Sequence, residues 1–397
     1  MLVSLALIFI MGLSLGAIFK KIKLPPLIGM LLTGIILGPF VLNLISADIL
    51  NISSSLRQIA LIIIMIRAGL SLDISSLKKL GLPAILLCFL PSLFEMSGTI
   101  LLAMFLLNME VLDAAILASI LASASPAVLV PRMISYIEEG YGSEKSLPQL
   151  LLASESIDDI LNVVILSALM SIAVGENFNL GSTLFNIPLS LIYALAFGTA
   201  IGLILVTFFK KYHMRDSIKV IIIISIAFLF VALENDSNII PFSGLLAVMS
   251  LGIIILQTYE VLATRLSKKF SKLWVAAEIV LFVLVGASVN INYVDKAGLN
   301  AVILIFGIFL FRALGILISI IPTNFNGKEK FFCVLTGIPK ATMQAALGGI
   351  PLMAGLESGE IILAVSVLTI LITAPLGAIA LDLSHKKLLK KSTSTAK

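Results

Sequence analysis

Residues 147–174 read LPQLLLASESIDDILNVVILSALMSIAV. A helix of this length can cross a lipid bilayer with some tilt. Asp158 and Asp159 lie near its middle, and Glu155 comes one turn earlier. Spacings of three and four residues place the three carboxylates on one face of the helix. A charged side chain at that depth is costly, so three in one span predict a functional site.

Crowded carboxylates in a poor dielectric repel one another when they are ionised, which favours holding a proton near neutral pH. A group in that state can exchange its proton for a metal cation. The span therefore predicts proton-coupled cation transport, with Asp158, Asp159 and Glu155 as oxygen ligands for Na⁺ or Li⁺.

The composition is that of an integral membrane protein. The chain has 397 residues, of which 59% are hydrophobic and 12% are charged, whereas soluble proteins carry about 25% charged residues. The apolar segments predict about 13 transmembrane helices in one all-α membrane domain over residues 1–397. The loops are short, so we expect a lipid bilayer as surroundings and no soluble regulatory domain. The two cysteines lack CxxC spacing and suggest neither a disulfide nor a zinc site. We expect no cofactor and no enzyme activity.

Lysine and arginine residues are concentrated in alternate loops, including a predicted loop with Arg265, Lys268 and Lys272 before a span at 275–289. The opposite set of loops holds Arg57 and Lys296. Positive charge marks the cytoplasmic side of a membrane protein. We therefore expect the N-terminus outside and the C-terminus inside a cell membrane, and we attribute the basic charge to topology rather than to nucleic-acid binding.

Two parts of the chain carry a related pattern. Residues 66–77 (IRAGLSLDISSL) and 284–294 (LVGASVNINYV) each have a Gly followed by small and apolar residues. Two spans later, each half has a poor helix, at 113–134 with Pro126 and at 330–353 with several Gly and Pro. Corresponding spans are an odd number of spans apart, so the two halves are inverted. Inverted repeats with broken spans indicate the binding site of a secondary transporter.

Charged residues inside the other spans need partners, because an unpaired charge in the membrane is costly. Glu95 and Arg312 occupy equivalent spans of the two halves and predict a structural ion pair. Lys340 lies at the break of the second poor helix, from which we expect it to reach the aspartates, compensating their charge or joining in exchange. Ser125, beside the first break, is the best hydroxyl ligand, and carbonyls of the unwound segments would add oxygens. Arg67 is expected to extend to the cytoplasmic interface.

Three motifs in this order resemble the NHA subgroup of sodium/proton antiporters, in the cation:proton antiporter superfamily. They are RAGL at 67–70, LASASPAVLVP at 121–131 before the Asp pair, and PKATMQAALG at 339–348. The resemblance covers essentially the whole chain. It implies an NhaA-like antiporter fold with inverted repeats and two crossed broken helices, and a role in pH homeostasis.

The same resemblance implies a homodimer in which a core domain moves past a dimerisation domain in an elevator-like motion. The core would comprise residues 57–174 and 275–382, and the dimerisation or scaffold helices residues 1–44 and 187–257.

The resemblance also implies roles for individual residues. Ions and protons would compete for the Asp pair, with Asp159 as the principal carboxylate and Asp158 as its partner near Lys340. A Glu–Arg pair in the NHA subgroup matches Glu95 and Arg312.

Other functions remain open at this point: a K⁺/H⁺ antiporter, a Na⁺-coupled organic-solute symporter and a passive channel. A buried Lys beside carboxylates favours exchange over conduction. An intramembrane aspartyl protease is excluded, because it needs two aspartates on different helices, whereas adjacent side chains of one helix diverge by about 100°.

Overall fold

The computed structural model describes residues 1–22, 24–71, 81–174, 180–236, 242–289 and 291–391. These residues form helices and no β-strand, with one isolated antiparallel bridge between Tyr141 and Lys391. The predicted all-α fold is therefore confirmed. The Glu155 side chain, residues 72–77 of the first repeat segment and Asn290 of the second lie outside the described residues.

The chain forms two compact units. The first consists of Met1–Ser54, Ile74–Val174 and Leu281–Lys397, and the second of Ser55–Asp73 and Gly175–Val280. The expected division into a core and a dimerisation domain stays a prediction, because compactness alone does not show which part moves.

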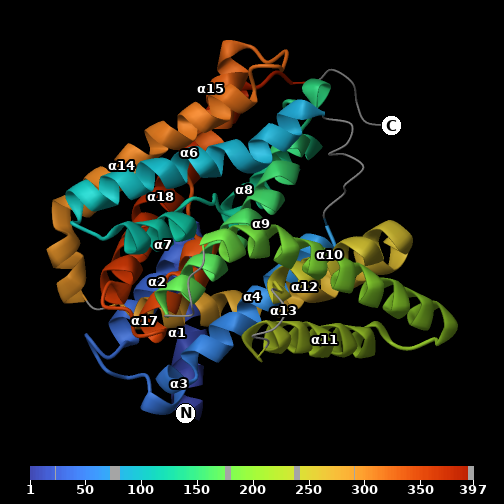
Figure 1. Cartoon of the computed structure of the whole chain (residues 1–397), viewed down its shortest axis with the longest axis horizontal. Helices are drawn as coiled ribbons and strands as arrows, with labels where there is room; N and C mark the ends of the chain where they lie inside the picture. Colours follow the sequence, from blue (N-terminus) through green and yellow to red (C-terminus); the bar gives the residue numbers. More distant parts are fainter. Residues whose placement is uncertain (23, 72–80, 175–179, 237–241, 290, 392–397) are drawn as a thin grey trace. The chain divides into compact units, whose positions relative to one another are not determined.

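The helices of the first unit are shown in Figure 1. They are α1 (Leu2–Lys21), α2 (Pro26–Leu37), α3 (Ala47–Asn51), α6 (Leu82–Leu106), α7 (Val111–Leu121), α8 (Pro126–Glu138), the 3₁₀ helix η1 (Ser143–Lys145), α9 (Leu147–Ala173), α14 (Ile291–Ser319), α15 (Gly327–Thr336), α16 (Thr342–Leu347), α17 (Ile350–Met353) and α18 (Gly359–Leu388).

The second unit is also built from helices. They are α4 (Ser53–Gly69), α10 (Leu180–Lys211), α11 (Asp216–Asp236), α12 (Gly244–Thr258) and most of α13 (Glu260–Ala287). The predicted basic loop before residue 275 is wrong, because α13 already begins at Glu260. Leu262, Leu266 and Phe270 are fully buried at a spacing of four residues, so an apolar face stabilises the helix there.

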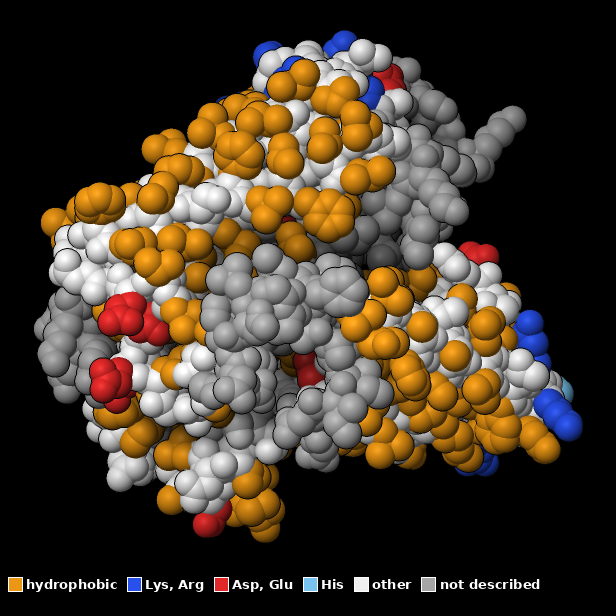
Figure 2. Space-filling model, in the orientation of Figure 1, with side chains coloured by type: hydrophobic (Ala, Val, Ile, Leu, Met, Phe, Trp, Pro, Cys, Tyr) orange, Lys and Arg blue, Asp and Glu red, His pale blue; other side chains and the backbone are white. Residues whose placement is uncertain are grey.

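The helix surfaces fit a membrane environment. Seven helices among the described residues are long and apolar enough to cross a bilayer, and shorter apolar helices of 10–17 residues accompany them. Figure 2 shows hydrophobic side chains spread over the outer face of α6 and α14. Exposed examples are Leu93, Leu101, Phe105, Leu310 and Leu314. Lipid removes the need for a polar exterior, and the charged side chains of Glu95 on α6 and Arg312 on α14 are buried.

Helices α6 and α14 lie side by side and pack at very short range (Figure 1). A Cβ atom added at Gly315 on α14 would lie 2.7 Å from the Cα of Pro91 on α6. Only glycine permits this approach of the two backbones. The close packing brings Glu95 of α6 next to Arg312 of α14.

Candidate functional site

Two interrupted helices meet in the first unit. Helix α7 ends at Leu121 and α8 begins at Pro126, where a proline is favourable because the first helical residue needs no N–H donor. Helix α15 ends at Thr336 and α16 begins at Thr342. Both predicted interruptions are confirmed.

The segments between these helices bind one another. The Ser125 backbone N–H donates to the Pro339 carbonyl at 2.8 Å, and the hydroxyls of Ser125 and Thr342 lie 3.1 Å apart. Contacts of this kind satisfy the polar groups that an interrupted helix leaves open. The structure therefore places the hydroxyl of Ser125, an expected ion ligand, against the other broken helix.

Asp158 and Asp159 on α9 lie beside the first interruption, and their exposed fractions are only 1% and 5%. The Ser123 hydroxyl, between α7 and α8, donates to Asp159 Oδ1 at 2.8 Å. Adjacent residues of a helix point about 100° apart, so Asp158 meets a different set of neighbours. The Asp159 carboxylate is thus in direct contact with the segment that interrupts α7 and α8.

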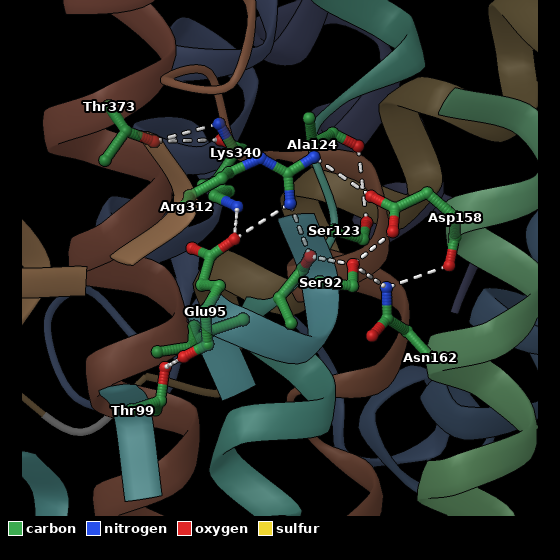
Figure 3. A network of polar contacts seen from close by, with 12 residues as sticks. Ser92, Glu95, Thr99, Ser123, Ala124, Asp158, Asn162, Arg312, Lys340 and Thr373 are labelled. Atoms are coloured by element: carbon green, nitrogen blue, oxygen red, sulfur yellow. Dashed lines mark hydrogen bonds and ion pairs between the residues drawn. The ribbon is translucent and has the colours of Figure 1, made fainter. Parts of the chain in front are cut away.

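Arg312 joins two carboxylates in a buried cluster (Figure 3). Its Nη1 lies 2.9 Å from Glu95 Oε2, and its Nη2 lies 2.9 Å from Asp158 Oδ2. Lys340 Nζ lies 2.7 Å from the same Glu95 oxygen. Exposed fractions of these side chains are between 0% and 3%. The four formal charges balance, as a buried group of charges requires.

The contact of Lys340 differs from the expectation that it would reach the aspartates. Its ammonium binds Glu95, and Arg312 takes the position beside Asp158. The guanidinium is a planar fork that can bridge two carboxylates, whereas an ammonium acts as a point charge. The expected neighbours Glu95 and Arg312 do lie together, and their structural role stays a prediction.

Ser92 and Asn162 belong to the same network (Figure 3), although sequence reasoning did not single them out. The Ser92 hydroxyl donates to Asp158 Oδ1. The Asn162 amide donates to the Ser92 hydroxyl at 3.1 Å and to the Asp158 carbonyl at 2.9 Å. Ser92 precedes Glu95 by three residues and Asn162 follows Asp158 by four. This helical spacing was the available signal.

Two further polar side chains of the apolar helices have other contacts. The Ser154 hydroxyl donates to the Leu151 carbonyl of its own helix at 3.1 Å. Arg67 belongs to the second unit, where it interacts electrostatically with Glu278. The contribution of Glu155 stays a prediction, because its side chain lies outside the described residues.

The chain is similar in sequence to known exchangers. The family model "Sodium/hydrogen exchanger, transmembrane" matches residues 5–383. Mouse sodium/hydrogen exchanger 9B2 is 33% identical over 418 residues, which cover 98% of this chain and 74% of that protein. Human sodium/hydrogen exchanger 9B2 is 34% identical over 404 residues, covering 96% and 73%.

A solved structure shares the fold. The sodium proton antiporter MjNhaP1 from Methanocaldococcus jannaschii superposes with a TM-score of 0.85, at 22% sequence identity and 97% coverage of both chains. The long sequence match and the fold agree with the resemblance drawn from the three motifs. The chain belongs to the transmembrane sodium/hydrogen exchanger family.

Proposed function

We propose that the protein exchanges Na⁺ or Li⁺ for H⁺, and that ion and proton compete for the carboxylates of Asp158 and Asp159. Membership of the sodium/hydrogen exchanger family supports Na⁺/H⁺ antiport. The contact between Ser123 and Asp159 carries the choice of site, because it joins a buried carboxylate to the interruption of α7 and α8. Irregular backbone at membrane depth is tolerated where it is buried in protein or lines a pathway.

The two aspartates have different parts in this proposal. Asp158 is held by Arg312 and Ser92, which fixes the position of its carboxylate. Asp159 contacts the neutral hydroxyl of Ser123 at the interruption between α7 and α8. A cation could bind to the Asp159 carboxylate and this hydroxyl together, and a proton could bind to the same carboxylate. We assign Asp159 as the principal ion and proton carboxylate and Asp158 as its partner in the site. Lys340, Glu95 and Arg312 keep the surrounding charge balanced.

The transport cycle that fits this site is alternating access by an elevator-type movement of a core domain within a homodimer. The core proposed from the motifs is 57–174 and 275–382, with 1–44 and 187–257 as the scaffold. The distribution of basic residues supports an outside N-terminus and a cytoplasmic C-terminus in the cell membrane.

Purified protein in liposomes with an internal pH dye tests the function. A Na⁺ or Li⁺ gradient should move protons in the opposite direction, and K⁺ or a gradient of organic solute should not. Asp159→Asn should remove this flux with little effect on melting temperature. Thr207→Val, which removes an exposed hydroxyl that donates to the Leu203 carbonyl of its own helix, is the control. Full Na⁺-driven proton flux in Asp159→Asn would reject the proposed site. Proton flux in the parent protein driven only by K⁺ would reject Na⁺ and Li⁺ as the exchanged ions.

A further inference from the structure

The carbonyl groups at the end of α7 already have hydrogen-bond donors. Gln344 Nε2 lies 3.0 Å from the Ile120 carbonyl, 3.4 Å from that of Leu121 and 3.1 Å from that of Ser123. The Ala122 carbonyl accepts from Arg312 Nη1 at 2.6 Å. Carbonyls of the unwound segment were expected as ion ligands, and two of them, those of Ala122 and Ser123, accept hydrogen bonds from side chains.

Gln344 makes its contacts from the opposite half of the chain. It lies on α16, directly after the second interruption, and its exposed fraction is 0%. The last carbonyls of a helix have no partner within the helix, and leaving them unsatisfied in a buried place is costly. The Gln344 side-chain amide of the second interrupted helix therefore caps the C-terminal end of α7 in the first.

Gln344 is linked to Asp159, the proposed principal carboxylate, through one intervening residue, Ser123. It holds the Ser123 carbonyl at 3.1 Å, and the Ser123 hydroxyl holds Asp159 Oδ1 at 2.8 Å. A shift of the Ser123 backbone would displace the hydroxyl that meets this carboxylate. The position of Gln344 is thus coupled to the geometry around Asp159 through a single intervening residue.

The orientation of the amide is fixed by its surroundings. Three carbonyl oxygens surround Nε2, so a flipped amide would oppose oxygen to oxygen. Gln344 Oε1 is then left buried, and no described residue gives it a hydrogen bond. A buried acceptor in this state is suited to a water molecule or a dehydrated cation.

We propose that Gln344 is a positioning residue that sets the spacing of Ser123 and Asp159 and thereby determines which alkali cation the site prefers. The inference rests on the proposed exchange at Asp159. Li⁺ and Na⁺ differ in size, and selection between cations depends on the spacing and rigidity of their oxygen ligands. Removing the hydrogen bonds of the Gln344 amide should change the apparent KM values for Li⁺ and Na⁺ by different factors.

Gln344→Met tests this directly, because it keeps a long side chain and removes both donors. We expect the ratio of the Li⁺ and Na⁺ KM values in liposomes to change about fivefold or more, with a smaller change in maximal rate. Thr369→Val is the matched control. Thr369 is also fully buried, but its hydroxyl donates at 2.7 Å within its own helix.

Ser123→Ala supplies the second arm. If Gln344 acts through Ser123, both variants should shift the ratio in the same direction, and the double variant should shift it no further than the larger single change. If Gln344→Met does not yield folded protein, Gln344→Asn replaces it, since the shorter amide loses the same reach.

A Gln344→Met ratio within about twofold of the parent, or a double variant that adds both shifts in full, would overturn the inference. The parent and Asp159→Asn are measured alongside. Loss of exchange in Asp159→Asn with an unchanged Gln344→Met ratio rejects the positioning role alone. Retained exchange in Asp159→Asn rejects the proposed site itself.

Discussion

Glu95 forms ion pairs with two positively charged side chains, so replacing it should leave the buried cluster with unbalanced charge. Its Oε2 lies 2.7 Å from Lys340 Nζ and 2.9 Å from Arg312 Nη1. At an effective dielectric constant of about 20, each attraction is worth about 6 kcal/mol before desolvation is counted. Glu95→Ala removes both and leaves one net positive charge in a place where the exposed fraction is at most 3%.

The expected net loss is about 3–5 kcal/mol of unfolding free energy, as for a buried pair that loses one partner. Because whole proteins are stable by only about 5–15 kcal/mol, the purified protein should melt several degrees lower. Thermal unfolding in detergent, followed by the fluorescence of a thiol dye or of Trp274, measures this.

The double variants give the sharper test. Glu95→Gln with Lys340→Met leaves Arg312 beside Asp158, a balanced pair at 2.9 Å, so most of the stability should return. Glu95→Ala with Arg312→Ala has the same formal charge but deprives Asp158 of its guanidinium, so it should recover less. Parental melting in Glu95→Ala, or equal recovery in both doubles, would refute the charge-balance reasoning.

Three further outcomes are expected. The apparent KM for Na⁺ should rise about tenfold for each unit that pH falls below the titration of the Asp158–Asp159 site, if one proton competes, because protons occupy the same oxygens; a KM that is flat from about pH 6 to 9 contradicts competition. Gly315→Val should destabilise the protein by about 1–3 kcal/mol through overpacking against Pro91, whereas Gly327→Ala, with open space around its Cβ position, should melt like the parent. Arg132→Ala breaks an ion pair with Asp382 in which the two side chains are 21% and 48% exposed, so the unfolding free energy should fall by no more than about 1 kcal/mol. A larger loss of stability in the melting assay would contradict this.

Features that depend on local composition followed from the sequence. The apolar segments predicted a helical membrane protein, because crossing lipid requires a run of apolar residues that satisfies its own backbone. The two helix interruptions could be predicted for a similar reason, because Pro and Gly disfavour a helix through local effects that do not depend on tertiary contacts. The error at α13 has the opposite origin. Its basic residues suggested a loop, whereas a buried face at helical spacing decided the structure.

The partners of the buried charges were decided by the tertiary structure. Sequence symmetry placed Glu95 with Arg312, which are 217 residues apart. It gave no reason to expect Lys340 on Glu95, 245 residues away, or Arg312 on Asp158, 154 residues away. The roles of Ser92, Asn162 and Gln344 also appeared only in three dimensions. Electrostatic and hydrogen-bonding energies depend on distances between atoms, and for residues far apart in the chain those distances are fixed by how α6, α9, α14 and α16 pack.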